Sequence, residues 1–182
     1  MRVTALLTVL IVLAMSSLSE SETSGPFKYI GSEKCKMCHN TAKQGKQYTI
    51  WKGGPHAKAY ETLANEESIK IAKKMDIANP QKSGKCLSCH VTAFGVADSL
   101  KVETFSIEEG VGCEACHGPG SEYKSMSIMK DQEKAVAAGL LIIEETTCTN
   151  CHNEKSPTYK PFKYEEAVKV IAHPIPAEEE EE

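Results

Sequence analysis

Stretches of mixed apolar and polar residues along the chain predict several helices. Residues 32–53 are predicted to form a helix that stops at Gly53 and Gly54. A second helical stretch runs over residues 55–76, where Pro55 suits a helix start and Leu63 lies among its apolar positions.

The second half of the chain continues this pattern. Residues 123–140 are predicted to be helical and to end at Gly139, and residues 163–173 form an amphipathic helix stopped by Pro174. Residues 91–107 are expected to form a short strand or an extended loop. The expected fold class is therefore mainly α.

The N-terminus has the pattern of an export signal. Arg2 precedes an apolar run that is shorter than the roughly 20 residues a bilayer span needs, and serines follow it. We expect a signal peptide at 1–19, with cleavage after Ser16 as the alternative. The expected division is then one domain at 20–176 and an acidic, disordered tail at 177–182. The chain is predicted to be periplasmic or extracellular, with no stable membrane insertion.

Composition suggests that side chains alone do not fill the core. The 182 residues include four Phe, six Tyr and one Trp, and apolar residues are scattered between lysine- and glutamate-rich intervals. Either the core is thin or a non-protein group completes it. The formal net charge is −4 and there is no basic stripe, so nucleic acid is not an expected partner.

All eight cysteines fall into four units of the form Cys-x-x-Cys-His. Their cysteines are Cys35 and Cys38, Cys86 and Cys89, Cys113 and Cys116, and Cys148 and Cys151, followed by His39, His90, His117 and His152. Four disulfides would not explain a histidine after each second cysteine. Zinc sites use paired cysteines too, but their histidines usually lie on a separate element.

Attachment of c-type haem explains every part of the unit. The two thiols bond to the two vinyl groups of the haem, and the adjacent histidine is directed at the iron. Four such haems would also supply the missing apolar core. Gly110 and Gly112, beside the third unit, either allow close approach of the backbone to the macrocycle or are ordinary turn residues.

Each haem iron has a second axial position, and the ligand there separates electron transfer from ligand chemistry. The histidines outside the four units are His56 and His173, and both are predicted to be distal ligands. Two irons would then have no second histidine. Met129, or less favourably Met126, could supply a thioether, although methionine more often serves core packing.

Several segments resemble the cytochrome c554 family of tetrahaem c-type cytochromes. The resemblance lies in YIGSEKCKMCH, Trp51 with HAKAYETL, CLSCHVTAFG, GVGCEACHGPGSEY, CTNCH and FKYEEAVKVIAH, which cover nearly all of the chain after the signal. It implies a mostly helical, compact multihaem fold in which four closely packed haems form the core, and an electron-transfer role.

The resemblance also implies a set of axial ligands. His173 would ligate the first haem, His56 the third, and the second haem would be five-coordinate. Family members carry a distal histidine after the GPG segment, whereas this chain has none between His117 and His152. For the fourth haem this leaves methionine, an open site or a histidine from a neighbouring subunit.

The leading hypothesis is therefore a non-enzymatic carrier that relays single electrons between a redox donor and a redox acceptor. A reductase acting on nitric oxide or a related nitrogen species at an open haem is the first alternative. A homo-oligomer, as the subunit of an extracellular cytochrome filament, is the second.

Overall fold

The computed structural model describes residues 26–176, so the predicted signal peptide and acidic tail lie outside the described residues. The described chain is mostly helical, as the sequence predicts, and contains no strand. The α-helices are α1 Glu33–His39, α2 Gln47–Gly53, α3 Ala59–Thr62, α4 Glu66–Lys74, α5 Gly84–His90, α6 Cys113–His117, α7 Met126–Met129, α8 Gln132–Ala137, α9 Glu145–Thr149 and α10 Tyr164–Ile171. Five short 3-10 helices join them: η1 Ala42–Gln44, η2 His56–Lys58, η3 Pro80–Lys82, η4 Asp98–Leu100 and η5 Ile107–Glu109.

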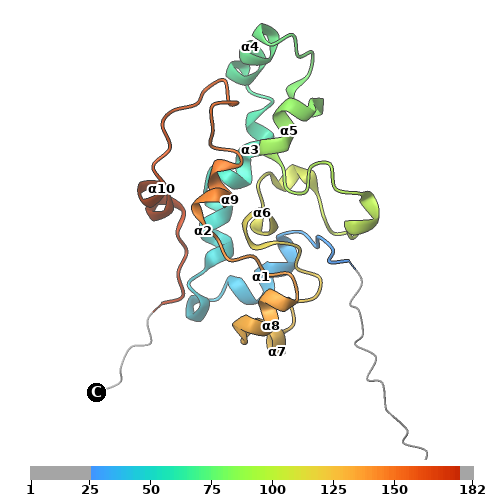
Figure 1. Ribbon diagram of the computed structural model, residues 1–182, viewed down its shortest axis with the longest axis vertical. Helices are drawn as coiled ribbons and strands as arrows, with labels where there is room; N and C mark the ends of the chain where they lie inside the picture. The colour runs from blue at the N-terminus through green and yellow to red at the C-terminus, as the bar shows by residue number, and fades with distance from the viewer. Residues whose placement is uncertain (1–25, 177–182) are drawn as a thin grey trace, which may run out of the picture.

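In Figure 1, α4 and α5 lie at one end of the long axis and α7 and α8 at the other. Between them lie α1, α2, α6 and α9, while α10 is set to one side by extended segments. Among residues 26–176, no helix has the length and apolar character needed to cross a bilayer.

The helix predicted over residues 32–53 is broken in the middle. Gly45 and Lys46 both adopt left-handed backbone angles, with φ of 86° and 52°. Helix α1 already ends at His39, and the left-handed Gly45 and Lys46 separate η1 from α2, so α1 and α2 are distinct helices that pack against each other. The predicted stop is correct, because α2 ends at Gly53 and the Gly54 N–H caps the Trp51 carbonyl.

Two other predicted helices are also divided at capping residues. The 55–76 stretch splits at Asn65, whose side chain accepts a hydrogen bond from the Ser68 N–H and starts α4. The 123–140 stretch splits at Asp131, which caps α8 in the same way through the Lys134 N–H. Asn and Asp compete for backbone N–H groups, which favours a new helix start over continuation.

The strand alternative for residues 91–107 is wrong, and the extended-loop alternative is right. This segment carries η4 and the beginning of η5, and its one β-type contact is an isolated bridge between Tyr29 and Lys101. The bridge rests on the hydrogen bonds Tyr29 N–H to Leu100 O at 2.8 Å and Val102 N–H to Tyr29 O at 3.0 Å.

Hydrophobic burial within the described residues is small. Nine hydrophobic residues are buried, and Leu63, Leu87 and Val91 form the one cluster among them. Large apolar side chains remain exposed beside the motifs, including Met37, Leu141 and Ile142. A chain of this size normally buries about two-thirds of its unfolded surface around apolar side chains, so a large apolar group is needed to complete this core.

The Glu114 carboxylate of α6 bonds to two segments of the backbone, one before α1 and one after α6. It is 2% exposed and accepts hydrogen bonds from the N–H groups of Ile30, Gly31 and Gly120 at 2.7–3.0 Å. A buried carboxylate is tolerated where several N–H groups satisfy it. The residues that precede α1 are thereby fixed against α6.

A second polar group lies beside the first. Ser32 is 1% exposed; its Oγ donates to Glu109 and accepts from the Cys113 N–H at 3.0 Å. Burial raises the pKa of Glu109, while its hydrogen bonds with Ser32 act in the opposite direction. An added Cβ at Gly112 would collide with Glu109 Oε1 and lie 2.6 Å from Ser32 Oγ. Glycine at this position therefore leaves room for the side chains of Glu109 and Ser32 beside the backbone.

Replacement of Glu114 by alanine should destabilise the fold strongly. Glu114→Ala leaves three buried N–H groups without acceptors, at a cost of at least about 3 kcal/mol in the free energy of unfolding. Urea unfolding of the haem-loaded protein, followed by circular dichroism, measures this loss. Glu108→Ala is the matched control, because Glu108 is an exposed glutamate of η5, six residues before Glu114. Equal unfolding midpoints for the two variants would contradict the role given to Glu114.

Candidate haem-binding site

The four Cys-x-x-Cys-His units all lie on or directly after short helices. In α1, α5 and α6 the motif histidine is the last helical residue, and in the fourth unit Cys151 and His152 follow the end of α9. All eight cysteines are free, and the described residues hold no group of three or more metal-ligating side chains. Neither the disulfide nor the zinc interpretation of the motifs is supported by this geometry, whereas free thiol pairs on helices fit attachment to haem.

His56 lies beside the histidine of the fourth unit. Its ring centroid is 6.0 Å from that of His152, with an angle of 69° between the ring planes. Two imidazoles that bind one ion from opposite sides at about 2 Å, each with its ring centre about 1 Å behind the nitrogen, have centroids about 6 Å apart. The pair therefore has the spacing of two axial ligands. Phe162 stacks on the His152 ring, with the two ring centroids 4.9 Å apart.

His173 forms the corresponding pair with the histidine of the third unit. The centroids of His117 and His173 are 6.1 Å apart and their ring planes meet at 76°. His173 follows the end of α10, so this helix positions the His173 ring beside His117 of α6. Each of the two histidines outside the motifs thus faces one motif histidine.

These partners differ from those implied by the family resemblance, which placed His173 at the first haem and His56 at the third. The structure places His173 beside His117 and His56 beside His152. His56 is held in this position by its backbone, because its carbonyl accepts a hydrogen bond from the Val111 N–H at 2.9 Å. The fourth unit therefore has a histidine opposite it within the same chain, where the sequence left methionine, an open site or a neighbouring subunit.

The two remaining motif histidines have their Nδ1 atoms engaged by oxygen acceptors. His90 Nδ1 lies 2.7 Å from the Ala59 carbonyl, and His39 Nδ1 lies 3.3 Å from Gln47 Oε1. A carbonyl oxygen can only accept, so Nδ1 donates and the lone pair of the neutral ring is on Nε2. That is the tautomer a histidine needs to bind iron through Nε2. Nothing in the sequence pattern pointed to Ala59 or Gln47.

Burial keeps two of the paired rings in the ligand-competent state. It lowers the pKa of His56, with His152 nearby as the second cause. Burial also lowers the pKa of His117, followed by the effects of His173 and His39. Iron binds the neutral imidazole, so a lowered pKa favours coordination.

Contacts between cysteines indicate which units are neighbours. The neighbouring Cys113 thiol is the largest cause of the raised pKa of Cys35, followed by burial. Burial, followed by the nearby Cys89 thiol, raises the pKa of Cys151 to about 12. Burial, followed by the nearby Cys148 thiol of the fourth unit, raises the pKa of Cys116. The first unit therefore adjoins the third, the third adjoins the fourth, and the fourth adjoins the second.

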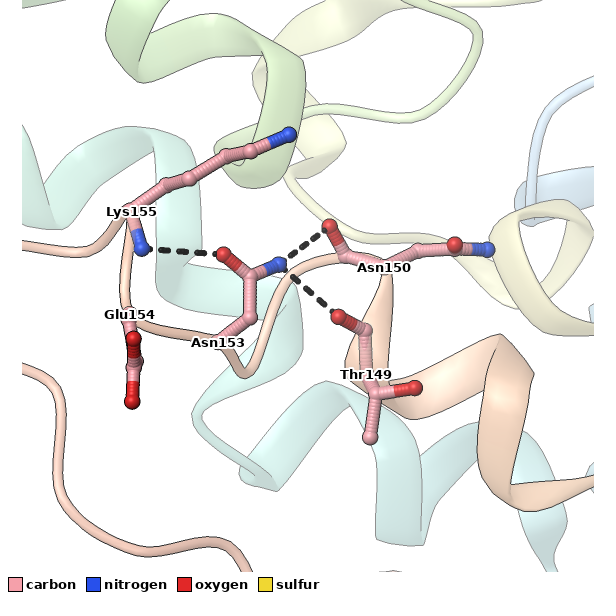
Figure 2. A pocket seen from close by; sticks show the side chains of 5 residues that line it. All are labelled: Thr149, Asn150, Asn153, Glu154 and Lys155. Carbon is pink, nitrogen blue, oxygen red and sulfur yellow. Dashed lines mark hydrogen bonds between the residues drawn. The ribbon is translucent and has the colours of Figure 1, made fainter.

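The fourth unit borders an open hollow of about 530 Å³. Figure 2 shows the side chain of Asn153 turned back toward the end of α9, where its Nδ2 donates to the carbonyls of Thr149 and Asn150 at 2.8 and 2.9 Å. This side chain fixes the turn that carries His152, a role the sequence gave no reason to expect.

The methionines stay untested as ligands. Met129 is half-buried and Met126 is 64% exposed, both in α7.

Comparison with known proteins agrees with the motifs. Residues 34–118 match the family model for cytochrome c554 and c-prime, and residues 78–165 match that for cytochrome c3. The cytochrome c-554 of Nitrosomonas europaea is 34% identical over 122 residues, which are 63% of this chain and 49% of the relative. The match therefore spans about half the length of that curated protein.

The fold agrees as well. The solved structure of reduced cytochrome c554 from Nitrosomonas europaea matches with a TM-score of 0.54 and 27% identity, and the match covers 80% of this chain and 79% of that one. The first family match spans three of the four motifs and the structural match covers most of the chain, so this chain is similar in sequence and in fold to the multihaem cytochromes of the cytochrome c554 family, a similarity that supports c-type haem iron at its motifs.

Proposed function

We propose that this chain is an exported tetrahaem cytochrome that relays single electrons between a redox donor and a redox acceptor. Bound haem would supply the one-electron iron couple at each unit. The single observation that carries the proposal is the spacing of the two histidine pairs, 6.0 Å and 6.1 Å, which suits two irons closed on both sides. A closed iron exchanges electrons but binds no substrate.

The proposed ligation uses all six histidines of the chain. His117 with His173 would hold the third iron, and His152 with His56 the fourth. His39 and His90 would each hold one iron, the first and the second, without a second histidine. A histidine from a neighbouring subunit is not needed at the fourth haem, since His56 of the same chain can fill that position.

The cysteine contacts support an order of electron transfer. The first unit adjoins the third through Cys35 and Cys113, and the fourth adjoins the second through Cys151 and Cys89. The order would be first, third, fourth, second. In this order the two closed irons are internal and the two irons with one histidine are at the ends. This arrangement keeps the small-molecule reductase alternative open, at an end iron.

The test of this function is the haem content and spin state of the purified protein. We expect four haems that survive denaturation and acid–acetone extraction, because thioether bonds hold them. Low-temperature electron paramagnetic resonance of the oxidised protein should count two low-spin irons, with the other two high-spin. Fewer than four covalent haems would overturn the tetrahaem assignment. Four low-spin irons would contradict the proposal that the first and second irons each have a single histidine ligand.

Removal of either histidine outside the motifs, His56 or His173, should leave one more iron with a single histidine ligand. His56→Ala and His173→Ala should each convert one low-spin signal to high-spin, and the double variant should convert both. Lys58→Ala is the control for His56, because Lys58 is an exposed residue of the same 3-10 helix, η2. An unchanged spectrum in either histidine variant would return that histidine to a structural role.

A further inference from the structure

The first unit lies on the most exposed of the three motif helices that end in their own histidine. Helix α1 contains no buried residue, Met37 is 85% exposed, and Cys38 is exposed. In contrast, α5 buries Leu87 in the apolar cluster, and α6 buries Glu114. If the first iron is one end of the proposed order, its surroundings face solvent.

The segment that carries this unit is strongly basic. Residues 33–60 contain six lysines and one acidic residue, a formal charge of +5, in a chain whose overall charge is −4. All six lysines are exposed, and we refer to them as the lysine face: Lys34, Lys36, Lys43, Lys46, Lys52 and Lys58. Within residues 26–176, Lys36 is the one member of the face in an ion pair, with Glu33 at 3.4 Å.

The segments that carry four of these lysines are in contact. Helix α1, with Lys34 and Lys36, packs against α2, with Lys52, and α2 packs against η2, with Lys58. Lys36 of α1 lies over the ring of Tyr48 in α2, with Nζ 5.3 Å from the centroid. Lys52 covers Trp51 of the same helix at 5.6 Å. Positive charge therefore spans both sides of the boundary between α1 and α2.

We infer that the lysine face is the docking surface through which the first haem exchanges electrons with an acidic redox protein. Complementary charge raises the rate of encounter and orients the partner, and this effect weakens as ionic strength rises. The inference rests on the proposed electron-transfer function and adds the place of exchange and the charge of the partner. One electron passes between the partner and the iron held by His39, and no proton or other group is transferred.

A small anionic oxidant tests the charge of the exchange site. Stopped-flow mixing of the reduced, haem-loaded protein with hexacyanoferrate(III) moves one electron from haem iron to the oxidant. In Lys34→Glu/Lys43→Glu the second-order rate constant should fall threefold or more at about 10 mM ionic strength. With cationic tris(phenanthroline)cobalt(III) the rate constant should rise. Both differences should shrink at high salt.

The matched control is Lys73→Glu/Lys74→Glu. These lysines are exposed on α4, and Figure 1 shows α4 at the end of the molecule away from α1. The net charge of the two double variants is identical, so a local docking effect appears in the first and not in the second. Equal effects in both variants, or none in either, would overturn the inference.

An acidic protein probe tests the docking itself. Reduced plant-type ferredoxin should pass one electron to the oxidised protein with a rate constant that falls in Lys34→Glu/Lys43→Glu and stays constant in the α4 control. Binding of phosphatidylglycerol vesicles by the lysine face, with ferredoxin and hexacyanoferrate rates unchanged in the variant, would show a membrane surface instead and overturn the inference. Four covalent haems and the expected spin states in every variant would confine such a failure to the docking surface and leave the proposed function standing.

Discussion

The buried carboxylate of Glu114 is the interaction on which the arrangement of the motifs depends. It satisfies backbone N–H groups before α1 and after α6, so the first and third units are fixed to each other by hydrogen bonds and not by an apolar core. Ser32 adds a second bridge between the same two segments through Glu109 and the Cys113 N–H. Nine hydrophobic residues are buried among those described, so packing of apolar side chains contributes little to this arrangement.

These polar contacts explain why motif spacing along the chain does not determine motif proximity in space. The second unit follows the first in the sequence, with Cys86 48 residues after Cys38, yet the thiol that most affects the pKa of Cys35 is Cys113 of the third unit. The backbone of Val111, just before the third unit, accepts a hydrogen bond from Trp51 and donates one to the His56 carbonyl. The segment before α6 therefore positions both the third unit and the histidine that faces the fourth.

The sequence was sufficient for the chemistry and for the helical class. Four Cys-x-x-Cys-His units identify c-type haem because each residue of the unit has a chemical role, and the caps and glycines mark most helix ends. It was insufficient for the histidine partners, since His56 and His173 could face any of four irons, and the family resemblance led to different partners from those in the structure. The break between His39 and Gln47 was also missed, in part because the left-handed conformation of Lys46 has no sequence signature.

The central claim is that the internal irons are each closed by one motif histidine and one distant histidine. A crystal structure of the haem-loaded protein, with iron located by anomalous scattering, tests it most directly. The account predicts that His56 and His152 bind one iron from opposite sides, that His117 and His173 bind another, and that no other histidine faces His39 or His90. A structure in which His56 faced His117, or His173 faced His39, would contradict it.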